Sequence, residues 1–208
     1  MSFSEYHEEL WEAIPAGREP EHLAVRLAFL LQRIDAGETV LDVGCGEGRF
    51  ASELARAGAH VIGIDVANEP LRRAAAAQPD LQLRLVAPAG PWPFDDASFD
   101  VVWAGEVIEH VHDTARWLSE IRRVLRPGGR LLLSTPAHPP LRRLGLALSP
   151  RAFQRHFDPL SDHLRFYTNG TLRRLLEEFG MREIEIQGGG PFPGARRLLL
   201  SSARRARF

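Results

Sequence analysis

Apolar residues in the first two thirds of the chain alternate between short runs and stripes at helical spacing. The runs that predict strands are TVLDV from Thr39, HVIGID from His60, LQLRLV from Leu81, FDVVWA from Phe99 and RLLLST from Arg130. The segments that predict helices between them are RFASELARAG, EPLRRAAAA and DTARWLSEIRRVL, the last with Asp113 as its N-cap. An earlier stripe from Leu23 to Ile34 predicts a helix that ends near Gly37.

The two ends of the chain frame this alternating region. Residues 1–37 form a predicted N-terminal helical segment. Residues 136–168 are rich in Pro, His and Arg, and we expect them to be irregular and to cover a site as a substrate lid. Beyond them NGTLRRLLEEFG predicts a helix, MREIEIQ a strand, and the tail ARRLLLSSARRARF a strand beside it. We interpret residues 1–208 as a single domain.

The order of these elements indicates the fold class. Strands that alternate with helices form right-handed βαβ units, which place helices on both faces of a parallel sheet. The sequence therefore predicts an α/β fold with a doubly wound, mostly parallel sheet. In such sheets ligands bind beyond the carboxyl ends of the strands, so the loop after the first strand is where we expect a site.

Composition narrows the classes of function. The 26 basic residues, all arginine, nearly balance 27 acidic ones, so no overall field draws the protein to nucleic acid or to anionic lipid. A single cysteine, Cys45, excludes an internal disulfide, and no apolar stretch has the length of a membrane span. The N-terminus lacks the pattern of a signal peptide, and we predict a cytoplasmic protein. The basic tail from Arg196 suits a weak membrane contact, although such runs are most often solvated ends.

A glycine-rich turn follows the first predicted strand in VLDVGCGEGRF. Gly44, Gly46 and Gly48 lead from strand to helix, where the absence of Cβ atoms lets backbone N–H groups approach a ligand. Asp65 ends the second strand, where an acid can accept both hydroxyls of a ribose. A nucleoside ligand is therefore expected, and the candidates are a nicotinamide dinucleotide and S-adenosylmethionine. The third glycine falls one place early for the dinucleotide fingerprint, and Arg49 holds its position.

Four successive segments resemble motifs of one enzyme family: VLDVGCGEGRF, GIDVA, PWPFDDASFDVVWAGEVIEHV and RVLRPGGRLLLSTP. In this order and spacing they look like the class I S-adenosylmethionine-dependent methyltransferases, and most like the subgroup that includes the ubiquinone-type O-methyltransferases. The resemblance runs from about Thr39 to Pro136. It implies a Rossmann-like fold with a seven-stranded sheet, S-adenosylmethionine as cofactor, and methyl transfer to a small-molecule acceptor, with a hydroxyl oxygen favoured (EC 2.1.1.-).

The resemblance also implies roles for particular residues around the cofactor. Matched by position, the residues around the methionine moiety would be Asp42, Gly44 and Gly46, with Cys45 packed under the ligand. Asp65 would hold the ribose, Val66 would pack on the adenine, and Gly105 and Glu106 would lie beside the sulfonium. Many relatives place an acid after the third strand to bind the adenine amino group. This chain has Pro88 there, so backbone groups near Ala87 are expected to replace it.

An acid–histidine cluster in GEVIEHVHD carries the remaining chemistry. Glu106, Glu109 and His110 lie close together in sequence, and His163 follows in the lid. Two carboxylates and imidazoles suit a divalent cation such as Mg²⁺. His110 or His163 would equally suit a general base that removes a proton from an acceptor hydroxyl. A purely structural role is the third interpretation, because related enzymes with no known metal carry a similar pattern.

Other functions stay open at this point. The cluster also resembles that of small-RNA 2′-O-methyltransferases, yet the scattered arginines form no clear basic patch, so a nucleic-acid partner is not favoured. The further alternatives are a dinucleotide-binding oxidoreductase and a catalytically silent binding protein of the same fold. The sequence is compatible with a monomer or a homodimer.

Overall fold

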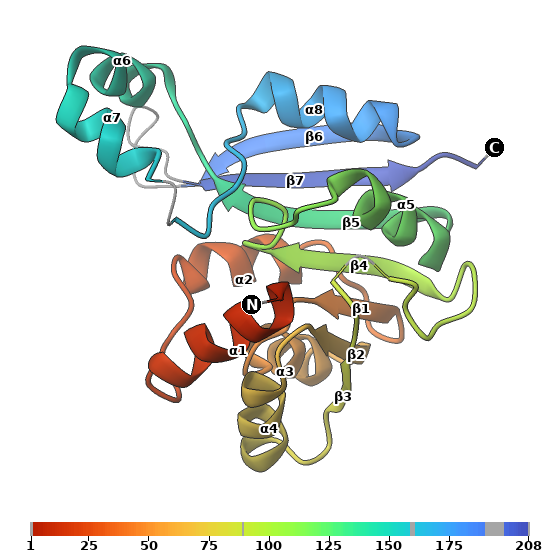
Figure 1. Cartoon of the computed structure of the whole chain (residues 1–208). Coiled ribbons are helices and arrows are strands. Elements are labelled where there is room, and N and C mark those ends of the chain that lie inside the picture. The colour runs from red at the N-terminus through yellow and green to blue at the C-terminus, as the bar shows by residue number, and fades with distance from the viewer. Residues whose placement is uncertain (1, 89, 159–160, 190–197, 208) are drawn as a thin grey trace.

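A single sheet of seven strands organises the chain in the computed structural model, which describes residues 2–88, 90–158, 161–189 and 198–207. The strands are β1 (Thr39–Val43), β2 (His60–Asp65), β3 (Gln82–Leu85), β4 (Phe99–Gly105), β5 (Leu125–Pro136), β6 (Met181–Gly189) and β7 (Leu198–Arg205). They lie in the order β3-β2-β1-β4-β5-β7-β6 (Figure 1). Strands β1 to β5 pair in parallel, and β7 pairs antiparallel with both β5 and β6. This confirms the predicted Rossmann-like fold with a mostly parallel sheet.

The strand order reverses at β1, which sets the place of the site. Val40 of β1 pairs with Val61 of β2 on one side and with Val101 of β4 on the other. The connections that leave the carboxyl ends of β1 and β4 therefore diverge there. A crevice at such a reversal is the usual ligand site of open α/β sheets.

Helices cover both faces of this sheet (Figure 1). They are α1 (Phe3–Ala13), α2 (Leu23–Leu31), α3 (Arg49–Arg56), α4 (Asn68–Ala77), α5 (Thr114–Val124), α6 (Pro140–Leu148), α7 (Pro150–His156) and α8 (Asn169–Glu178). Successive residues of a strand face opposite sides, so Val40 packs in the core cluster of α2 and α3 while Leu41 packs in that of α5 and α8. Asp42 has the same parity as Val40, which points its side chain toward the α2 and α3 side.

The predicted elements of the alternating region are present, and so is the strand in the tail. Asp113 caps α5 as expected, since its carboxylate accepts a hydrogen bond from the Arg116 backbone N–H at 2.9 Å. The expectation of an irregular region over residues 136–168 was wrong, because α6 and α7 lie within it. Pro140 and Pro150 stand in the first turns of these two helices, where proline lacks only an N–H that would be unpaired anyway.

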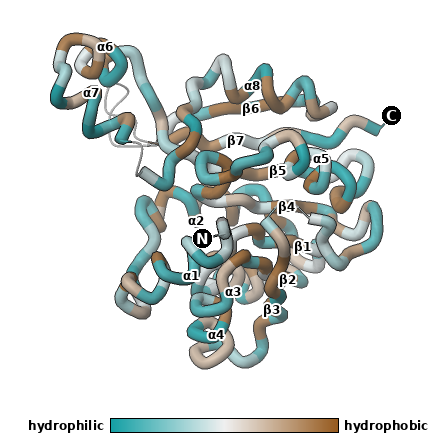
Figure 2. Tube along the Cα trace, viewed as in Figure 1, coloured by the Kyte–Doolittle hydropathy of each residue, from teal (hydrophilic) through white to brown (hydrophobic). Residues whose placement is uncertain are grey.

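None of the helices in the described residues combines the length and the apolar character that crossing a bilayer requires. Hydrophobic residues are concentrated along the central strands of the sheet (Figure 2).

Candidate cofactor and active site

The glycine turn after β1 has the backbone geometry that the sequence suggested. Gly44 and Gly46 have φ of 68° and 53°, in the left-handed region that favours glycine. A Cβ on Gly44 would lie 2.5 Å from the Val107 side chain, so no larger residue fits against the β4 loop. The turn thus brings backbone close to the loop that carries the acid–histidine cluster.

Asp65 closes the other side of this turn. Its Oδ2 accepts the Gly46 N–H at 2.9 Å, and its Oδ1 accepts the N–H groups of Val66 at 2.7 Å and Ala67 at 3.1 Å. Burial raises the pKa of Asp65, while these three donors oppose the rise. The carboxylate is therefore held rigidly at the end of β2.

A cavity of about 200 Å³ lies over this edge of the sheet. The predicted residues that line it are Gly44, Asp65, Val66, Glu106 and His110, and Pro88 lines it as well. Its apolar wall consists of Val43, Ile64, Val86, Trp92, Val107, Val111 and Trp117. An apolar slot with an acid at the end of β2 suits a purine nucleoside, whose base is flat and whose ribose presents two hydroxyls.

Helix α1, within the predicted N-terminal helical segment, completes the cavity. His7, Leu10, Trp11 and Ile14 line it, and a Cβ on Gly46 would meet the Trp11 ring at 3.0 Å. The signal that identifies this helix is the capping box S-x-x-E, in which Ser2 and Glu5 exchange hydrogen bonds with each other's backbone.

Polar tethers hold α1 in place. The Glu8 carboxylate accepts the backbone N–H groups of Asn68 at 2.5 Å and Glu69 at 2.9 Å, at the start of α4. Arg73 donates to the carbonyl oxygens of Trp11 at 3.0 Å and Ile14 at 2.8 Å. No residue of α1 whose burial is described is fully buried, so the helix is fixed by these bonds more than by apolar packing.

Two buried charges lie behind the cavity. Asp42 is 1% exposed, and its Oδ2 has no hydrogen-bond partner among the described residues. Burial raises the pKa of Asp42 to about 7, against the attraction of Arg26. Arg26 of α2 is itself buried, with its guanidinium carbon 4.5 Å from the centroid of the Phe50 ring. Its pKa is lowered by burial and raised by Glu106, Asp42 and Glu109, so Arg26 is the counter-ion of these acids.

The acid–histidine cluster follows β4. Glu106 has φ of 58°, and its Oε1 accepts the Ser134 hydroxyl at 2.9 Å. Glu109 is 1% exposed; its Oε2 accepts the Thr135 hydroxyl at 2.9 Å, while its Oε1 has no partner among the described residues. Burial and the nearby Glu106 charge raise the pKa of Glu109 well above its usual range. Residues 108–110 form a turn and not a helix.

His110 faces the cavity with a defined tautomer. Its Nδ1 lies 3.0 Å from the Asp162 carbonyl oxygen, which can only accept, so Nδ1 carries the proton and Nε2 presents a lone pair. That Nε2 lies 4.0 Å from Glu109 Oε1. Burial lowers the pKa of His110, which keeps the ring neutral near pH 7.

His163 joins this pair from the segment after α7. Its ring centroid lies 4.8 Å from that of His110. Ligand atoms of Glu109, His110 and His163 all lie within 4.8 Å of one another. Glu106, which was predicted to belong to this set, lies outside it.

The other predicted cofactor residues lie behind the cavity or at its edge. The Cys45 thiol is buried against Gly63, and burial raises its pKa, which leaves it a poor nucleophile. Gly105 lies against Arg26 and Trp103. Ala87 is exposed, and its carbonyl oxygen accepts the Trp92 indole N–H at 3.3 Å. Their roles toward a cofactor stay predictions.

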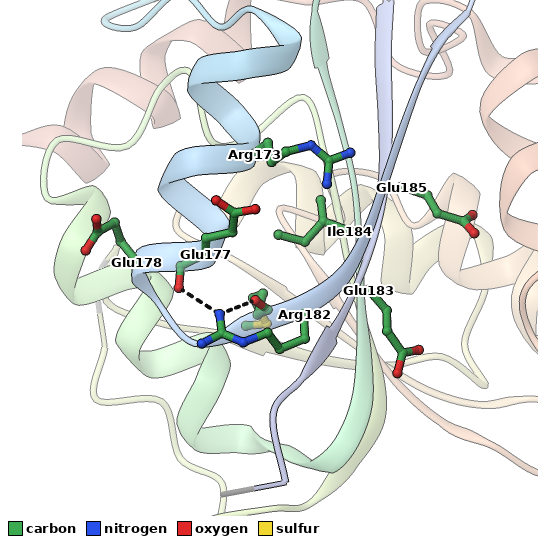
Figure 3. A pocket seen from close by; sticks show the side chains of 8 residues that line it. Arg173, Glu177, Glu178, Arg182, Glu183, Ile184 and Glu185 are labelled. Carbon is green, nitrogen blue, oxygen red and sulfur yellow. Dashed lines mark hydrogen bonds between the residues drawn. The ribbon is translucent and has the colours of Figure 1, made fainter.

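A wider hollow of about 1010 Å³ lies elsewhere, between α8 and the edge strand β6 (Figure 3). Its walls are charged side chains, among them Glu177 and Arg182, whose guanidinium is hydrogen-bonded to backbone carbonyl groups. None of the predicted site residues lines it. We therefore assign the chemistry to the smaller cavity.

The fold and the cavity together define an α/β domain in which the glycine turn, Asp65 and His110 of the acid–histidine cluster line one cavity at the carboxyl ends of the strands. Residues 16–186 match the family described as a methyltransferase domain. The chain therefore belongs to this family, which confirms the resemblance to S-adenosylmethionine-dependent methyltransferases and favours methyl transfer over a dinucleotide oxidoreductase.

Particular relatives agree with this assignment. The chain is 34% identical over 158 residues to the ubiquinone biosynthesis O-methyltransferase of Aeromonas salmonicida, a match that covers 73% of this chain and 66% of that protein. It is 40% identical over 135 residues to the 27-O-demethylrifamycin SV methyltransferase of Amycolatopsis mediterranei, covering 61% and 49%. The chain thus spans about half to two thirds of the length of these two relatives.

Solved structures share the fold. Phosphoethanolamine N-methyltransferase 2 of Haemonchus contortus, in complex with S-adenosyl-L-methionine, superposes with a TM-score of 0.72 at 17% identity. The match covers 99% of this chain and 60% of that one. At this identity the likeness establishes the fold alone.

Proposed function

We propose that the protein transfers the methyl group of S-adenosylmethionine to a hydroxyl oxygen of a small-molecule acceptor. The observation that carries this proposal is the neutral His110 Nε2, which faces the same cavity as the glycine turn and Asp65. The two relatives named above support it, since their names refer to an O-methyltransferase and to a 27-O-demethyl acceptor.

The proposed reaction is an in-line displacement. The acceptor oxygen attacks the methyl carbon, the bond from carbon to sulfur breaks, and S-adenosylhomocysteine leaves with the bonding electron pair. The hydroxyl proton passes to His110 Nε2, whose ring is held in the correct tautomer by the Asp162 carbonyl group. Removing this proton prevents the product from remaining a charged oxonium. Positioning by the cavity walls and exclusion of water supply the rest of the acceleration.

The buried acids orient the cofactor in this scheme. We assign Asp65 to the ribose hydroxyls, and Asp42 with Glu106 to the ammonium and sulfonium end. Supporting this assignment, Asp42 has an unpartnered buried oxygen beside the glycine turn, and Glu106 lines the cavity. Arg26 keeps part of this buried negative charge ionised.

A divalent cation is the alternative to the base role of His110, because it would occupy the same Nε2 lone pair. Glu109 Oε1 is buried without a partner, and one carboxylate with two imidazoles offers three ligands within 4.8 Å of one another. Imidazole ligands suit Zn²⁺ or Fe²⁺ better than Mg²⁺, which prefers oxygen ligands. When bound, such an ion would lower the pKa of an acceptor hydroxyl. Glu109, His110 and His163 would hold it.

Methyl-labelled S-adenosylmethionine and a panel of phenolic and aliphatic hydroxyl compounds test the proposal directly. We expect labelled product with the native protein, and a fall in kcat of roughly 100- to 10,000-fold in His110→Asn. The matched control is His60→Asn, at the exposed start of β2, which should retain full activity. Since the pKa of His110 lies below 6.5, the native rate should be flat near pH 7 and fall in more acidic buffer.

The same assay contains the results that would overturn the proposal. Equal rates for native protein and His110→Asn at every pH would exclude His110 as the base. Binding of S-adenosylhomocysteine with no labelled product across the panel would instead favour the catalytically silent alternative. Chelation by EDTA followed by addition of Mn²⁺, Zn²⁺ or Mg²⁺ separates the metal from the base, because only a metal role predicts loss and recovery of the rate.

A further inference from the structure

Helices α6 and α7 form an arm that stands away from the rest of the molecule (Figure 1). The two helices contact each other, yet no residue of either is buried. We define the arm as residues 140–157. Five of its apolar side chains are exposed: Leu141 69%, Leu144 55%, Leu148 75%, Phe153 50% and Phe157 41%.

The exposed leucines share one side of α6. Leu141, Leu144 and Leu148 recur at spacings of three and four, which brings them onto one stripe of an α-helix. Arg142 and Arg143 fall on the remaining sides, and the alternation is visible along α6 and α7 (Figure 2). An apolar stripe with arginines beside it is typical of helices that lie in a membrane interface.

The arm carries only positive charge. It holds Arg142, Arg143, Arg151 and Arg155, all exposed, and the sequence has no acidic residue between Glu120 and Asp158. No ion pair among the described residues involves these four arginines. The local charge therefore contrasts with the formal net charge of −1 for the whole chain, and it selects an anionic partner.

The root of the arm holds its position without the apolar stripe. His138 is buried, and its Nε2 lies 3.0 Å from His156 Nε2, while its Nδ1 lies 3.3 Å from the Tyr167 carbonyl oxygen. Since that carbonyl group accepts from Nδ1, the proton between the rings belongs to His156, and the Arg142 guanidinium lies 3.5 Å from His156 Nδ1. This chain of hydrogen bonds, from the Tyr167 carbonyl group through the two imidazoles to Arg142, fixes the root of the arm without using the leucines.

We propose that the arm binds the surface of an anionic lipid bilayer, with the leucine stripe inserted between the headgroups and the arginines against them. Charge excludes a second copy of this chain as the partner, because a symmetric contact between two arms would bring their arginines together. A nucleic acid matches the charge but leaves the three leucines unexplained. The inference goes beyond the proposed reaction and holds whether or not the protein methylates a hydroxyl.

Placement of the arm connects such a surface to the site. The chain that leaves α7 reaches Asp162 and His163, which contact His110 beside the cavity. A protein docked through the arm would therefore hold its acid–histidine cluster near the membrane, where apolar acceptors partition.

Flotation of the full chain with vesicles tests the proposal in the absence of cofactor and acceptor. We expect binding to vesicles of phosphatidylglycerol and phosphatidylcholine at 0.1 M salt, and little binding to phosphatidylcholine alone. Replacing Leu141, Leu144 and Leu148 by Ser should lower the partition coefficient at least about 100-fold, because each leucine inserts an apolar side chain into the bilayer. The control variant replaces Val25, Leu31 and Leu85, which are exposed outside the arm, by Ser. It should bind vesicles as the native protein does.

A second pair of variants tests the charge. Arg143→Gln, Arg151→Gln and Arg155→Gln together should lower binding roughly 100-fold, since each arginine near an anionic surface contributes about fivefold. The same change at Arg18, Arg56 and Arg174, which are exposed and lie outside the arm and the basic tail, alters the net charge equally and should have a much smaller effect. The proposal would be overturned if the arm leucine variant and its control bound vesicles equally, or if the native protein bound neutral and anionic vesicles equally. Retention by single-stranded RNA without vesicle binding would overturn it as well. Unchanged melting curves and S-adenosylhomocysteine affinity in the arm variants separate this result from a failure of the proposed reaction.

Discussion

Replacing Asp42 by Asn should stabilise the protein and weaken cofactor binding at once. Asp42 is buried with a pKa of about 7, compared with a usual value of 3.8. The folded state therefore binds a proton that the unfolded state releases between these pH values, and holding the carboxylate ionised opposes folding. The contribution of Asp42 to the free energy of unfolding is fully present below pH 3.8, and it is lost as pH rises toward 7.

The magnitude follows from the shift. A difference of about 3 pKa units corresponds to about 4 kcal/mol at pH 7 and about 2 kcal/mol at pH 5, because one unit is equivalent to about 1.4 kcal/mol. Asn resembles the neutral acid in shape, so Asp42→Asn should be more stable by up to these amounts. In a chain of 208 residues a gain of about 4 kcal/mol raises the melting temperature by roughly 8–16 °C at pH 7.

Urea unfolding at pH 5 and 7, with titration of S-adenosylhomocysteine, measures both effects. Loss of a charged contact to the ligand ammonium group should weaken affinity roughly 10- to 100-fold. The reasoning would be refuted by a variant that is no more stable than the native protein at pH 7, or by a gain that is larger at pH 5. Unchanged ligand affinity would separately remove Asp42 from the cofactor site.

Three further predictions follow from the tethers of α1 and of the arm. Trp11→Ala should uncover Gly46 and accelerate S-adenosylhomocysteine dissociation at least several-fold in stopped-flow fluorescence, and an unchanged rate constant would show that α1 does not gate the cavity. Glu8→Gln removes the carboxylate that caps α4 and should cost about 1 kcal/mol, seen as faster proteolysis near α1, whereas exposed Glu9→Gln should not. Burial lowers the pKa of His138 from its usual 6.5 to about 4. As pH falls through 6.5, the unfolded chain therefore binds a proton at His138 that the folded protein does not yet bind. Native protein should lose about 2 kcal/mol more than His138→Gln between pH 7 and 4.5 in urea unfolding, and parallel losses would contradict the buried neutral ring.

Local pattern predicted the parts of the fold that depend on near neighbours. The alternation of strands and helices around the glycine turn, and Asp65 at the end of β2, follow from periodicity and from the need for positive φ at Gly44 and Gly46. The two helices of the arm were not predicted, because Pro140 and Pro150 are read as breakers unless their place in a first turn is known.

Contacts between distant segments explain what the sequence did not reveal. Arg26 interrupts an otherwise apolar helix, which was a usable signal, but its role depends on Phe50 and on acids contributed by β1 and the β4 loop. The tautomer of His110 likewise depends on the Asp162 carbonyl group, which the chain brings back after α7. No local pattern encodes either arrangement.

Calorimetric titration of the purified protein with S-adenosylhomocysteine, and in parallel with NAD⁺, measures which nucleoside ligand the cavity binds. We expect one micromolar site for S-adenosylhomocysteine and no heat with NAD⁺, because the turn at Gly44 and Gly46 and the acid at Asp65 form the site of a single nucleoside. Binding of NAD⁺ in place of S-adenosylhomocysteine would contradict this expectation.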